Sequence, residues 1–479
     1  MELNHEELLL PVSPTGEYMR SSALSIAVYG VLEMEKPIED DDNALAMRLL
    51  KDVFLPINPR FSSIMITEKN GEKKWKRVEV KLEEHVKIPI FPQGMSLEYY
   101  DKCLKNYTEK IAMENFPHDR PLWEVHLIKY PTSNAAGNIV FKLHHALGDG
   151  YSLVGALLSC LQRMDNPSLP LTFPSRESKT NSLSNENEKS SSVFGFIPQT
   201  FSRVFNTCQD FGFGILKSTV MKDDYSPIRS SEEEIECRQI TMNDINISLD
   251  RIKQISTRLK VTINDVIVGA ISYGTRLYME EMDFKSSTSN STALVVLNTR
   301  ATGGYKSVSE MIKPNSEMPW GNHIAFMHVQ LPKLRASLSS SKPLDFVFDA
   351  RQSILRKRNS AAVYLNAILL QVIRKIRGSE ATARFFYDIF RNSSFTVTNL
   401  IGPLEKMSLA DRPIKGLYFF ASGVPQNITC TILSYMGNVR MCFTVEKDFI
   451  DSSKFISCIQ NAFDTIFQAA VHPNSKCTT

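Results

Sequence analysis

Residues Ile139–Gly150 read IVFKLHHALGDG, and this stretch decides more about the fold than any other. Apolar residues alternate up to two adjacent histidines, and a Gly-Asp-Gly turn then introduces the apolar run Tyr151–Arg163. The pattern predicts a strand, a tight turn and a helix. A histidine at the end of a buried strand can face a cavity from a rigid base, and imidazole accepts protons near neutral pH.

Size and composition limit the class of protein. A chain of 479 residues is too long for one ordinary core, so two domains are expected. The net charge of +3 gives no indication of a polyanionic partner, so no nucleic-acid ligand is expected. The eight cysteines show neither C-x-x-C pairs nor metal-ligand spacing, which predicts isolated thiols in a reducing compartment and no metal site.

Membrane and export signals are weak. The first residues, MELNHEE, are acidic and lack a long apolar core, so they do not resemble a signal peptide. No run approaches the ~18 uninterrupted apolar residues of a transmembrane helix. The segment Val193–Leu216 is rich in phenylalanine but contains Pro198, Arg203 and Asp210. It suits either a membrane interface or packing on the protein, and the sequence favours neither alternative.

A polar stretch divides the chain. Ser175–Ser192 lacks apolar periodicity and is interpreted as a linker. The predicted units are 1–174, then 175–235 with the linker and the aromatic segment, then 236–479. Both outer units mix strand and helix patterns, which predicts an α/β fold of two sandwiches with its site at their interface.

Local signals in the last unit support this organisation. Thr262 and Asp265 form a capping-box pattern at the start of an apolar helix. A long helical region is expected at Leu344–Phe390 and a strand at Leu417–Ala421. Gly437-Asn438 predicts a hairpin between two later strands.

His145 and Asp149 are the first candidates for chemistry. In the functional interpretation His145 is a general base, and its orientation depends on the turn that Asp149 holds. In the alternative, both histidines are satisfied structural groups at a strand end. The double histidine, the glycine turn, the strand before it and the helix after it together favour function.

The sequence also resembles a known family. His144–Gly150 resembles the HHxxxDG motif of CoA-dependent acyltransferases. Motifs similar to those of plant wax ester synthase/diacylglycerol acyltransferases are Pro11–Gly16, Pro121–Glu124 (PLWE), Asn264–Ile267 (NDVI), Gly321-Asn322 and Thr398–Pro403 (TNLIGP). They occur in order along nearly the whole chain. The DFGWG element of BAHD-type acyltransferases is not found, so acylation of small soluble alcohols or amines takes second place.

The resemblance implies two chloramphenicol-acetyltransferase-like domains with a tunnel at their interface. Acyl-CoA would enter as co-substrate from one mouth and a long-chain alcohol or diacylglycerol from the other, without a metal or bound cofactor. His145 would take the hydroxyl proton while the oxygen attacks the thioester directly. The resemblance further implies the endoplasmic reticulum membrane, with the catalytic part facing the cytosol and the cell membrane as a second location.

The remaining candidates follow from the same motifs. Asp149 is expected to pair with Arg300 of the second domain, the alternative being that Arg300 is exposed. Asn264 and Asn322 are candidate oxyanion donors, although either could instead serve a helix start or a turn. The other predicted site residues are His144 as a catalytic neighbour, Gly150 and Trp123 as substrate contacts, and Asp265 as a structural residue. His126 is interpreted as a core residue, Trp320 as a packing or tunnel-wall residue and His323 as a weaker candidate. A non-catalytic lipid-binding or CoA-binding protein remains a third class.

Overall fold

The computed structural model describes residues 9–69, 71–173, 196–231, 238–300, 307–313, 316, 319–334, 342–358 and 360–472. The strands are β1 (Leu9–Pro11), β2 (Ala27–Met34), β3 (Ser63–Thr67), β4 (Lys73–Arg77), β5 (Val86–Lys87), β6 (Trp123–Ile128), β7 (Gly137–His144), β8 (Gln162–Arg163), β9 (Ile240–Ser248), β10 (Thr292–Asn298), β11 (Ile324–Gln330), β12 (Phe395–Ile401), β13 (Met407–Leu409), β14 (Arg412–Ser422), β15 (Ile428–Tyr435) and β16 (Asn438–Glu446). The helices are α1 (Pro14–Met19), α2 (Asp41–Leu49), α3 (Leu55–Ile57), α4 (Leu82–His85), α5 (Leu97–Met113), α6 (Gly150–Ser159), α7 (Phe196–Thr219), α8 (Leu249–Leu259), α9 (Ile263–Met282), α10 (Val308–Met311), α11 (Pro343–Arg358), α12 (Ala362–Arg391) and α13 (Ser452–Val471). The linker predicted at Ser175–Ser192 lies outside the described residues.

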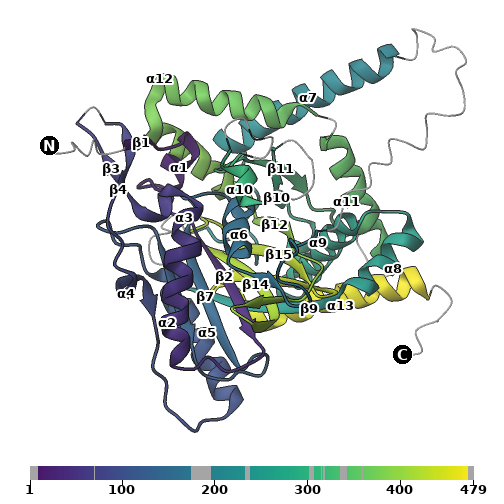
Figure 1. The fold of residues 1–479 in the computed structure, drawn as a ribbon. Coiled ribbons are helices and arrows are strands. Elements are labelled where there is room, and N and C mark those ends of the chain that lie inside the picture. Colours follow the sequence, from purple (N-terminus) through teal and green to yellow (C-terminus); the bar gives the residue numbers. More distant parts are fainter. Residues whose placement is uncertain are drawn as a thin grey trace, which may run out of the picture.

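A seven-stranded sheet of order β5-β6-β7-β2-β14-β13-β8 forms the first half (Figure 1). Successive residues of β2 point to its opposite faces. The hydroxyl of Tyr29 donates to the Ile111 carbonyl oxygen of α5. Gly30 points the other way, where an added Cβ would lie 3.1 Å from Leu157 of α6. The sheet is therefore covered by a helix on each face.

The sheet takes one of its strands from the far end of the chain. β14 pairs antiparallel with β2 along its length, although residues 412–422 belong to the unit predicted at 236–479. The strand predicted at Leu417–Ala421 is confirmed, and it joins the sheet of the first half rather than the six-stranded sheet formed by most strands of the unit predicted at 236–479. Apolar alternation identifies a strand but not the sheet that it joins.

The second half is built on a six-stranded sheet of order β11-β10-β12-β15-β16-β9. Helices α9 and α13 bury one of its faces in a large apolar cluster, and β14 contacts β15 and β16 of the same sheet. The capping box of Thr262 and Asp265 and the hairpin at Gly437 are confirmed. The region Leu344–Phe390 is helical as predicted, but it comprises the two helices α11 and α12. The predicted α/β pair of sandwiches is confirmed.

The aromatic segment predicted at Val193–Leu216 lies in α7 from Phe196 onward, and its first three residues lie outside the described residues. In its described part the segment packs on the protein, because Asp210 is buried and lies 2.9 Å from both Arg356 and Lys357 of α11. Lys217, also buried, pairs with Asp223. The packing alternative is therefore confirmed for these side chains. Among the described helices, none combines the length and the apolar character needed to cross a membrane.

The two halves meet at a seam along β2, and an ion pair joins them there. Arg440 of β16 forms a bidentate ion pair with Glu33 of β2, with both N–O distances at 2.9 Å. At the end of the β2–β7 ladder, Ala27 pairs with His144. His145 therefore leaves the sheet immediately after its last paired residue, beside the second half.

Candidate active site

The turn after β7 is held by backbone and side-chain bonds. The His145 N–H donates to the Ile26 carbonyl oxygen at 2.9 Å, which fixes the backbone of the histidine against the neighbouring strand. Asp149 is the N-cap of α6, and its Oδ1 accepts from the Ser152 N–H at 3.0 Å. An aspartate in this position satisfies a free helix donor, so the turn and the helix start are one rigid unit.

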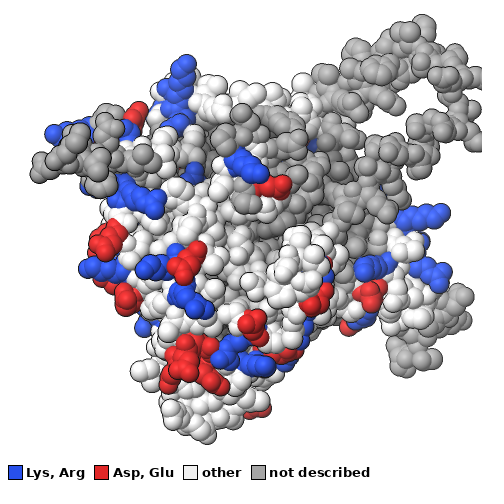
Figure 2. Space-filling model, viewed as in Figure 1, with Lys and Arg blue, Asp and Glu red and all other residues white. Residues whose placement is uncertain are grey.

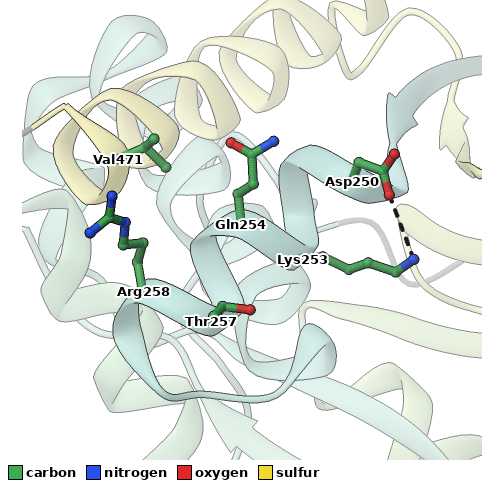
Figure 3. A pocket seen from close by; sticks show the side chains of 6 residues that line it. All are labelled: Asp250, Lys253, Gln254, Thr257, Arg258 and Val471. Carbon is green, nitrogen blue, oxygen red and sulfur yellow. Dashed lines mark ion pairs between the residues drawn. The ribbon is translucent and has the colours of Figure 1, made fainter.

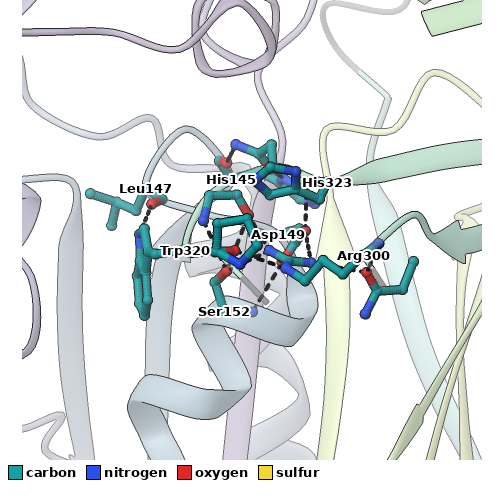
Figure 4. A network of polar contacts seen from close by, with 11 residues as sticks. His145, Leu147, Asp149, Ser152, Arg300, Trp320 and His323 are labelled. Carbon is teal, nitrogen blue, oxygen red and sulfur yellow. Dashed lines mark hydrogen bonds and ion pairs between the residues drawn. The ribbon is translucent and has the colours of Figure 1, made fainter. Parts of the chain in front are cut away.

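Asp149 also forms the predicted ion pair across the seam (Figure 4). Arg300 donates from Nη1 to Oδ2 at 2.7 Å and from Nη2 to Oδ1 at 3.1 Å, and both side chains are fully buried. The His323 backbone N–H donates to the same carboxylate at 2.8 Å. The predicted pair is confirmed and the exposed alternative for Arg300 is wrong. A buried pair of this geometry is stabilised by its additional hydrogen bonds.

Sequence reasoning missed the partners that complete this network. Ser152 Oγ donates to the Gly321 carbonyl oxygen at 3.1 Å and accepts from Arg300 Nη2 at 3.0 Å. The indole N–H of Trp320 donates to the Leu147 carbonyl oxygen at 2.9 Å. The spacing Asp149-x-x-Ser152 is a signal for the cap, but nothing local predicts that the Gly321 region, about 170 residues later, would join it.

Asn322 holds the imidazole of His145. Its Nδ2 donates to the His145 carbonyl oxygen at 2.9 Å, and its Oδ1 lies 2.8 Å from His145 Nδ1. Because a carbonyl can only accept, the amide nitrogen must face it and Oδ1 must face the ring. His145 Nδ1 therefore carries the proton, and the lone pair is on Nε2. No described residue forms a hydrogen bond with that nitrogen.

The environment keeps His145 neutral. Burial lowers the pKa of His145 below its ordinary value of 6.5, and the Asp149 charge and the Asn322 hydrogen bond offset only part of this shift. The residue nevertheless keeps part of its surface accessible in spite of the dense protein around the ring. A neutral imidazole with an unprotonated Nε2 is the state that a general base requires.

His144 does not fit the catalytic role predicted for it. Its Nδ1 accepts from the Ala146 N–H at 3.0 Å, so its Nε2 carries the proton and donates to Ser25 Oγ at 3.2 Å. Burial and the cations of Arg20 and Lys142 lower its pKa well below 6.5. With both nitrogens in use, His144 is a structural support for the turn.

Two other candidates, Asn264 and Gly150, lie at the starts of α9 and α6. Asn264 does not cap α9, because Thr262 does; the Asn264 Oδ1 accepts instead from Asn399 Nδ2 at 3.0 Å. Gly150 is the first residue of α6, where an added Cβ would lie 3.2 Å from Leu400. These contacts bring the two motifs at Asn264 and Asn399 to one place, while their role toward a substrate stays a prediction.

Trp123 is not a substrate contact. It is fully buried, its indole N–H donates to the Phe61 carbonyl oxygen at 2.8 Å and its ring stacks on His85 at 4.1 Å. The prediction is wrong because the packed core at the start of β6 encloses the Trp123 side chain and leaves it no surface for a ligand. His126 is a buried core residue as interpreted, with Nδ1 2.8 Å from the Tyr107 hydroxyl.

Two hollows lie in different places. A cavity of about 190 Å³ between the two sheets is lined by Ser25 and Phe116, which both contact His144, and by Asn427 and Glu446 of the second half. His145 is not among its lining residues, so the tunnel between the halves stays a prediction. The other hollow lies on the surface of α8 and the end of α13, far along the chain from both histidines (Figure 3). The described residues hold no metal-binding cluster of three or more His, Cys, Asp or Glu side chains.

Two family models match the chain. Residues 43–267 match the wax ester synthase/diacylglycerol acyltransferase catalytic domain, and residues 320–467 match the WS/DGAT C-terminal domain. Wax ester synthase/diacylglycerol acyltransferase 4 of Arabidopsis thaliana is 28% identical over 92% of this chain and 86% of its own length. The relative numbered 5 from the same plant is 28% identical over 93% of this chain and 90% of its own length.

Solved structures show the same fold. The wax ester synthase/diacylglycerol acyltransferase from Marinobacter aquaeolei VT8 has a TM-score of 0.60 at 14% identity and covers 96% of this chain and 99% of its own. The first condensation domain of the CDA synthetase has a TM-score of 0.56 at 10% identity, over 97% and 96%. The expected CoA-acyltransferase-like pair of domains is confirmed. Taken with the two matching family models, this shows that the chain belongs to the wax ester synthase/diacylglycerol acyltransferase family and is an acyltransferase.

Proposed function

We propose that the protein transfers a fatty acyl group from acyl-CoA to a long-chain alcohol, and also to diacylglycerol, with His145 as general base. The observation that carries the proposal is the hydrogen-bonding state of the ring: Asn322 fixes the proton on Nδ1 and leaves the lone pair of Nε2 at the seam. The lowered pKa of His145 keeps this state at neutral pH.

In the proposed step, Nε2 takes the hydroxyl proton while the alcohol oxygen attacks the thioester carbonyl. The C–O bond forms, the C–S bond of the resulting oxyanion breaks, and the proton on Nε2 passes to the departing sulfur to give CoA. General-base help contributes roughly 10²–10⁴-fold. No enzyme nucleophile is needed, so both substrates bind together. Asn264 is the proposed oxyanion donor, since Asn399 occupies its oxygen and leaves its N–H groups for a ligand.

Lipid acceptors place the reaction at a membrane, and we propose the cytosolic face of the endoplasmic reticulum. Exposed apolar side chains on α7, including Phe205 and Leu216, support contact with a lipid surface. Fractionation of cells that express the chain tests this location. Recovery of the protein in the cell-membrane fraction alone would move the proposed location from the endoplasmic reticulum to the cell membrane. Recovery of the protein in no membrane fraction would contradict the proposal.

The test of the reaction is ester formation by the purified protein from palmitoyl-CoA. Hexadecanol, diacylglycerol and a phenolic alcohol serve as acceptors in parallel, with CoA release measured as free thiol. We expect hexadecyl palmitate from hexadecanol and triacylglycerol from diacylglycerol, in each case with one CoA released per ester formed, and a rate roughly 10²–10⁴-fold lower from a His145→Ala variant. Acylation of the phenol alone would indicate a small-molecule enzyme, and lipid binding without ester would indicate a non-catalytic protein. A covalent acyl-enzyme trapped by rapid quench would exclude direct transfer.

A further inference from the structure

The first part of α12 forms an outer layer of the molecule. Gly378 interrupts the helix with a φ of 83° and a ψ of 179°, so residues 362–377 make a separate straight piece beside α7 along the upper edge of the molecule (Figure 1). The inner side of this piece packs on the protein through Leu370, which contacts an apolar cluster containing Met19, Leu24 and Ile26.

The outer side of the same piece is apolar and exposed. Ile368, Val372 and Ile376 are 55%, 46% and 75% exposed. Residues four apart lie on one face of a helix, so the three side chains form a continuous stripe along two turns. Phe205 of α7, the helix that packs along α12, is 69% exposed. A stripe of this kind is unusual for a surface that contacts only water.

The charges beside the stripe have one sign. Residues 362–377 contain Arg374, Lys375 and Arg377 and no acidic residue. Arg374 pairs with Glu17 at 3.1 Å, while Lys375 and Arg377 are exposed. Figure 2 shows blue and white side chains over α12 at the upper edge of the molecule. Apolar side chains beside lysine and arginine are the composition of helices that lie in the interface of an anionic bilayer.

The same charges disfavour a second copy of the chain as the occupant. A twofold dimer through this face would bring the basic side chains of both copies into one interface. The repulsion would oppose the apolar contact, whereas phosphate headgroups would neutralise it.

The stripe lies one helix layer away from the histidine turn. Leu370 on the inner side contacts the cluster of Ile26, and the Ile26 carbonyl oxygen accepts the His145 N–H. A helix with its side chains is about 10 Å wide. A bilayer on the outer side of α12 would therefore lie close to the seam where the lipid substrates would have to enter.

We propose that residues 362–377 dock the protein on an anionic membrane, with Ile368, Val372 and Ile376 inserted and Lys375 and Arg377 on the headgroups. The geometry of this surface is independent of the role of His145. The role proposed for docking, bringing the protein to its lipid substrates, rests on the proposed acyl transfer, and docking and acyl transfer are tested separately.

The test is co-sedimentation of the full chain with phosphatidylcholine vesicles that contain or lack phosphatidylserine. We expect binding to the anionic vesicles. Val372→Ser with Ile376→Ser should weaken it about a hundredfold, since withdrawing each of these exposed apolar side chains from lipid changes partitioning about tenfold. Lys375→Gln and Arg377→Gln should each weaken it about fivefold. The matched control is Ile90→Ser, which removes a side chain that is 89% exposed in the first half and should leave binding unchanged.

Three outcomes would overturn the docking proposal. They are no binding of the unaltered chain to anionic vesicles, equal binding by the Val372→Ser/Ile376→Ser variant, and a dimer in solution that this variant dissociates while vesicle binding is unaffected. Turnover of palmitoyl-CoA and hexadecanol in neutral detergent separates this proposal from the function. A stripe variant that keeps turnover but loses vesicle binding supports docking, whereas normal docking without turnover contradicts only the function.

Discussion

Two buried groups in this protein have the same kinds of side chain but different surroundings. The seam group is His145, Asp149 and Arg300, and the sheet group is Glu124, His126 and Lys142. In the sheet group all three residues come from the adjacent strands β6 and β7, and Glu124 lies 3.5 Å from both His126 and Lys142. In the seam group, the aspartate and the arginine pair across the two halves and the histidine ring is held separately by Asn322.

The difference lies in whether a ligand can reach the second ring nitrogen. Each ring has one nitrogen in a hydrogen bond, His126 with the Tyr107 hydroxyl and His145 with Asn322. Nε2 of His126 is buried 3.5 Å from Glu124 without a hydrogen bond, whereas the residue His145 keeps part of its surface accessible. A histidine beside a carboxylate is therefore a candidate base only where the fold lets a ligand reach its free nitrogen.

The largest effect is expected from the histidines themselves. His145→Ala should lower kcat by roughly 10²–10⁴-fold, because the base is lost. His126→Ala is the matched control, since it removes a buried histidine of the sheet group and should lower stability without changing kcat of the folded protein. Ester formation and urea unfolding of both variants measure the two effects. Equal losses of kcat in the two variants would contradict the proposal that His145, and not His126, acts as the base.

The ion pair of the seam group should dominate stability. Arg300→Met leaves the Asp149 carboxylate buried without its cation and should lower the free energy of unfolding by about 3–5 kcal/mol. Asp149→Asn combined with Arg300→Met leaves no unpaired charge and should recover part of this loss. Urea unfolding of the single and double variants measures the coupling. If the loss in free energy of unfolding of the double variant equals the sum of the losses of Asp149→Asn and Arg300→Met, the two residues are not coupled.

The sheet group should act on acid stability. Burial alone would raise the pKa of Glu124, but the nearby ring of His126 and the charge of Lys142 outweigh it and hold the pKa at about 2, against an ordinary 4.5. A carboxyl group with a lowered pKa stabilises the fold fully above pH ~4.5 and loses this contribution as the pH falls toward ~2. Between these two pH values, the free energy of unfolding of the wild type should fall by about 2–3 kcal/mol more than that of Glu124→Gln. Urea unfolding at several pH values checks the difference, and parallel curves would contradict it.

The smallest effect is expected at the contact that orients the base. Asn322→Ala should lower kcat about tenfold, because the ring is no longer held with its proton on Nδ1. The hydrogen bond that His145 Nδ1 donates to the Asn322 amide oxygen raises the pKa of His145, so its removal should move the acid limb of the kcat/KM profile to lower pH. In the wild type this limb should already lie below 6.5, because burial lowers the pKa of His145. An unmoved limb would mean that Asn322 supports only the backbone of the turn.

The sequence predicted the elements that depend on neighbouring residues. The strand, turn and helix at Ile139–Gly150, the capping box at Thr262 and the hairpin at Gly437 are formed by residues close in the chain, so local patterns suffice. The pair of Asp149 and Arg300 was found because their motifs resemble those of a family.

Contacts chosen by tertiary packing were not predictable in this way. The bond between Asn322 and His145 joins residues 177 apart, and no local pattern distinguishes an asparagine that orients a ring from one that binds an oxyanion. Trp123 was misassigned because a tryptophan in a motif has the same sequence whether it lines a channel or fills a core. Which of the two sheets β14 joins depends on which sheet edge is unpaired when the halves meet, and the sequence of β14 alone does not determine this.

The shared strand also constrains how the protein is made. During synthesis the first half emerges long before Arg412–Ser422, and until then β2 has an unpaired edge. The ribosome therefore releases the histidine turn beside an incomplete sheet, exposed to association with other nascent chains. Arg300 and Asn322 also follow His145 in the chain, so the contacts that hold the histidine turn form only after the residues up to Asn322 have been made.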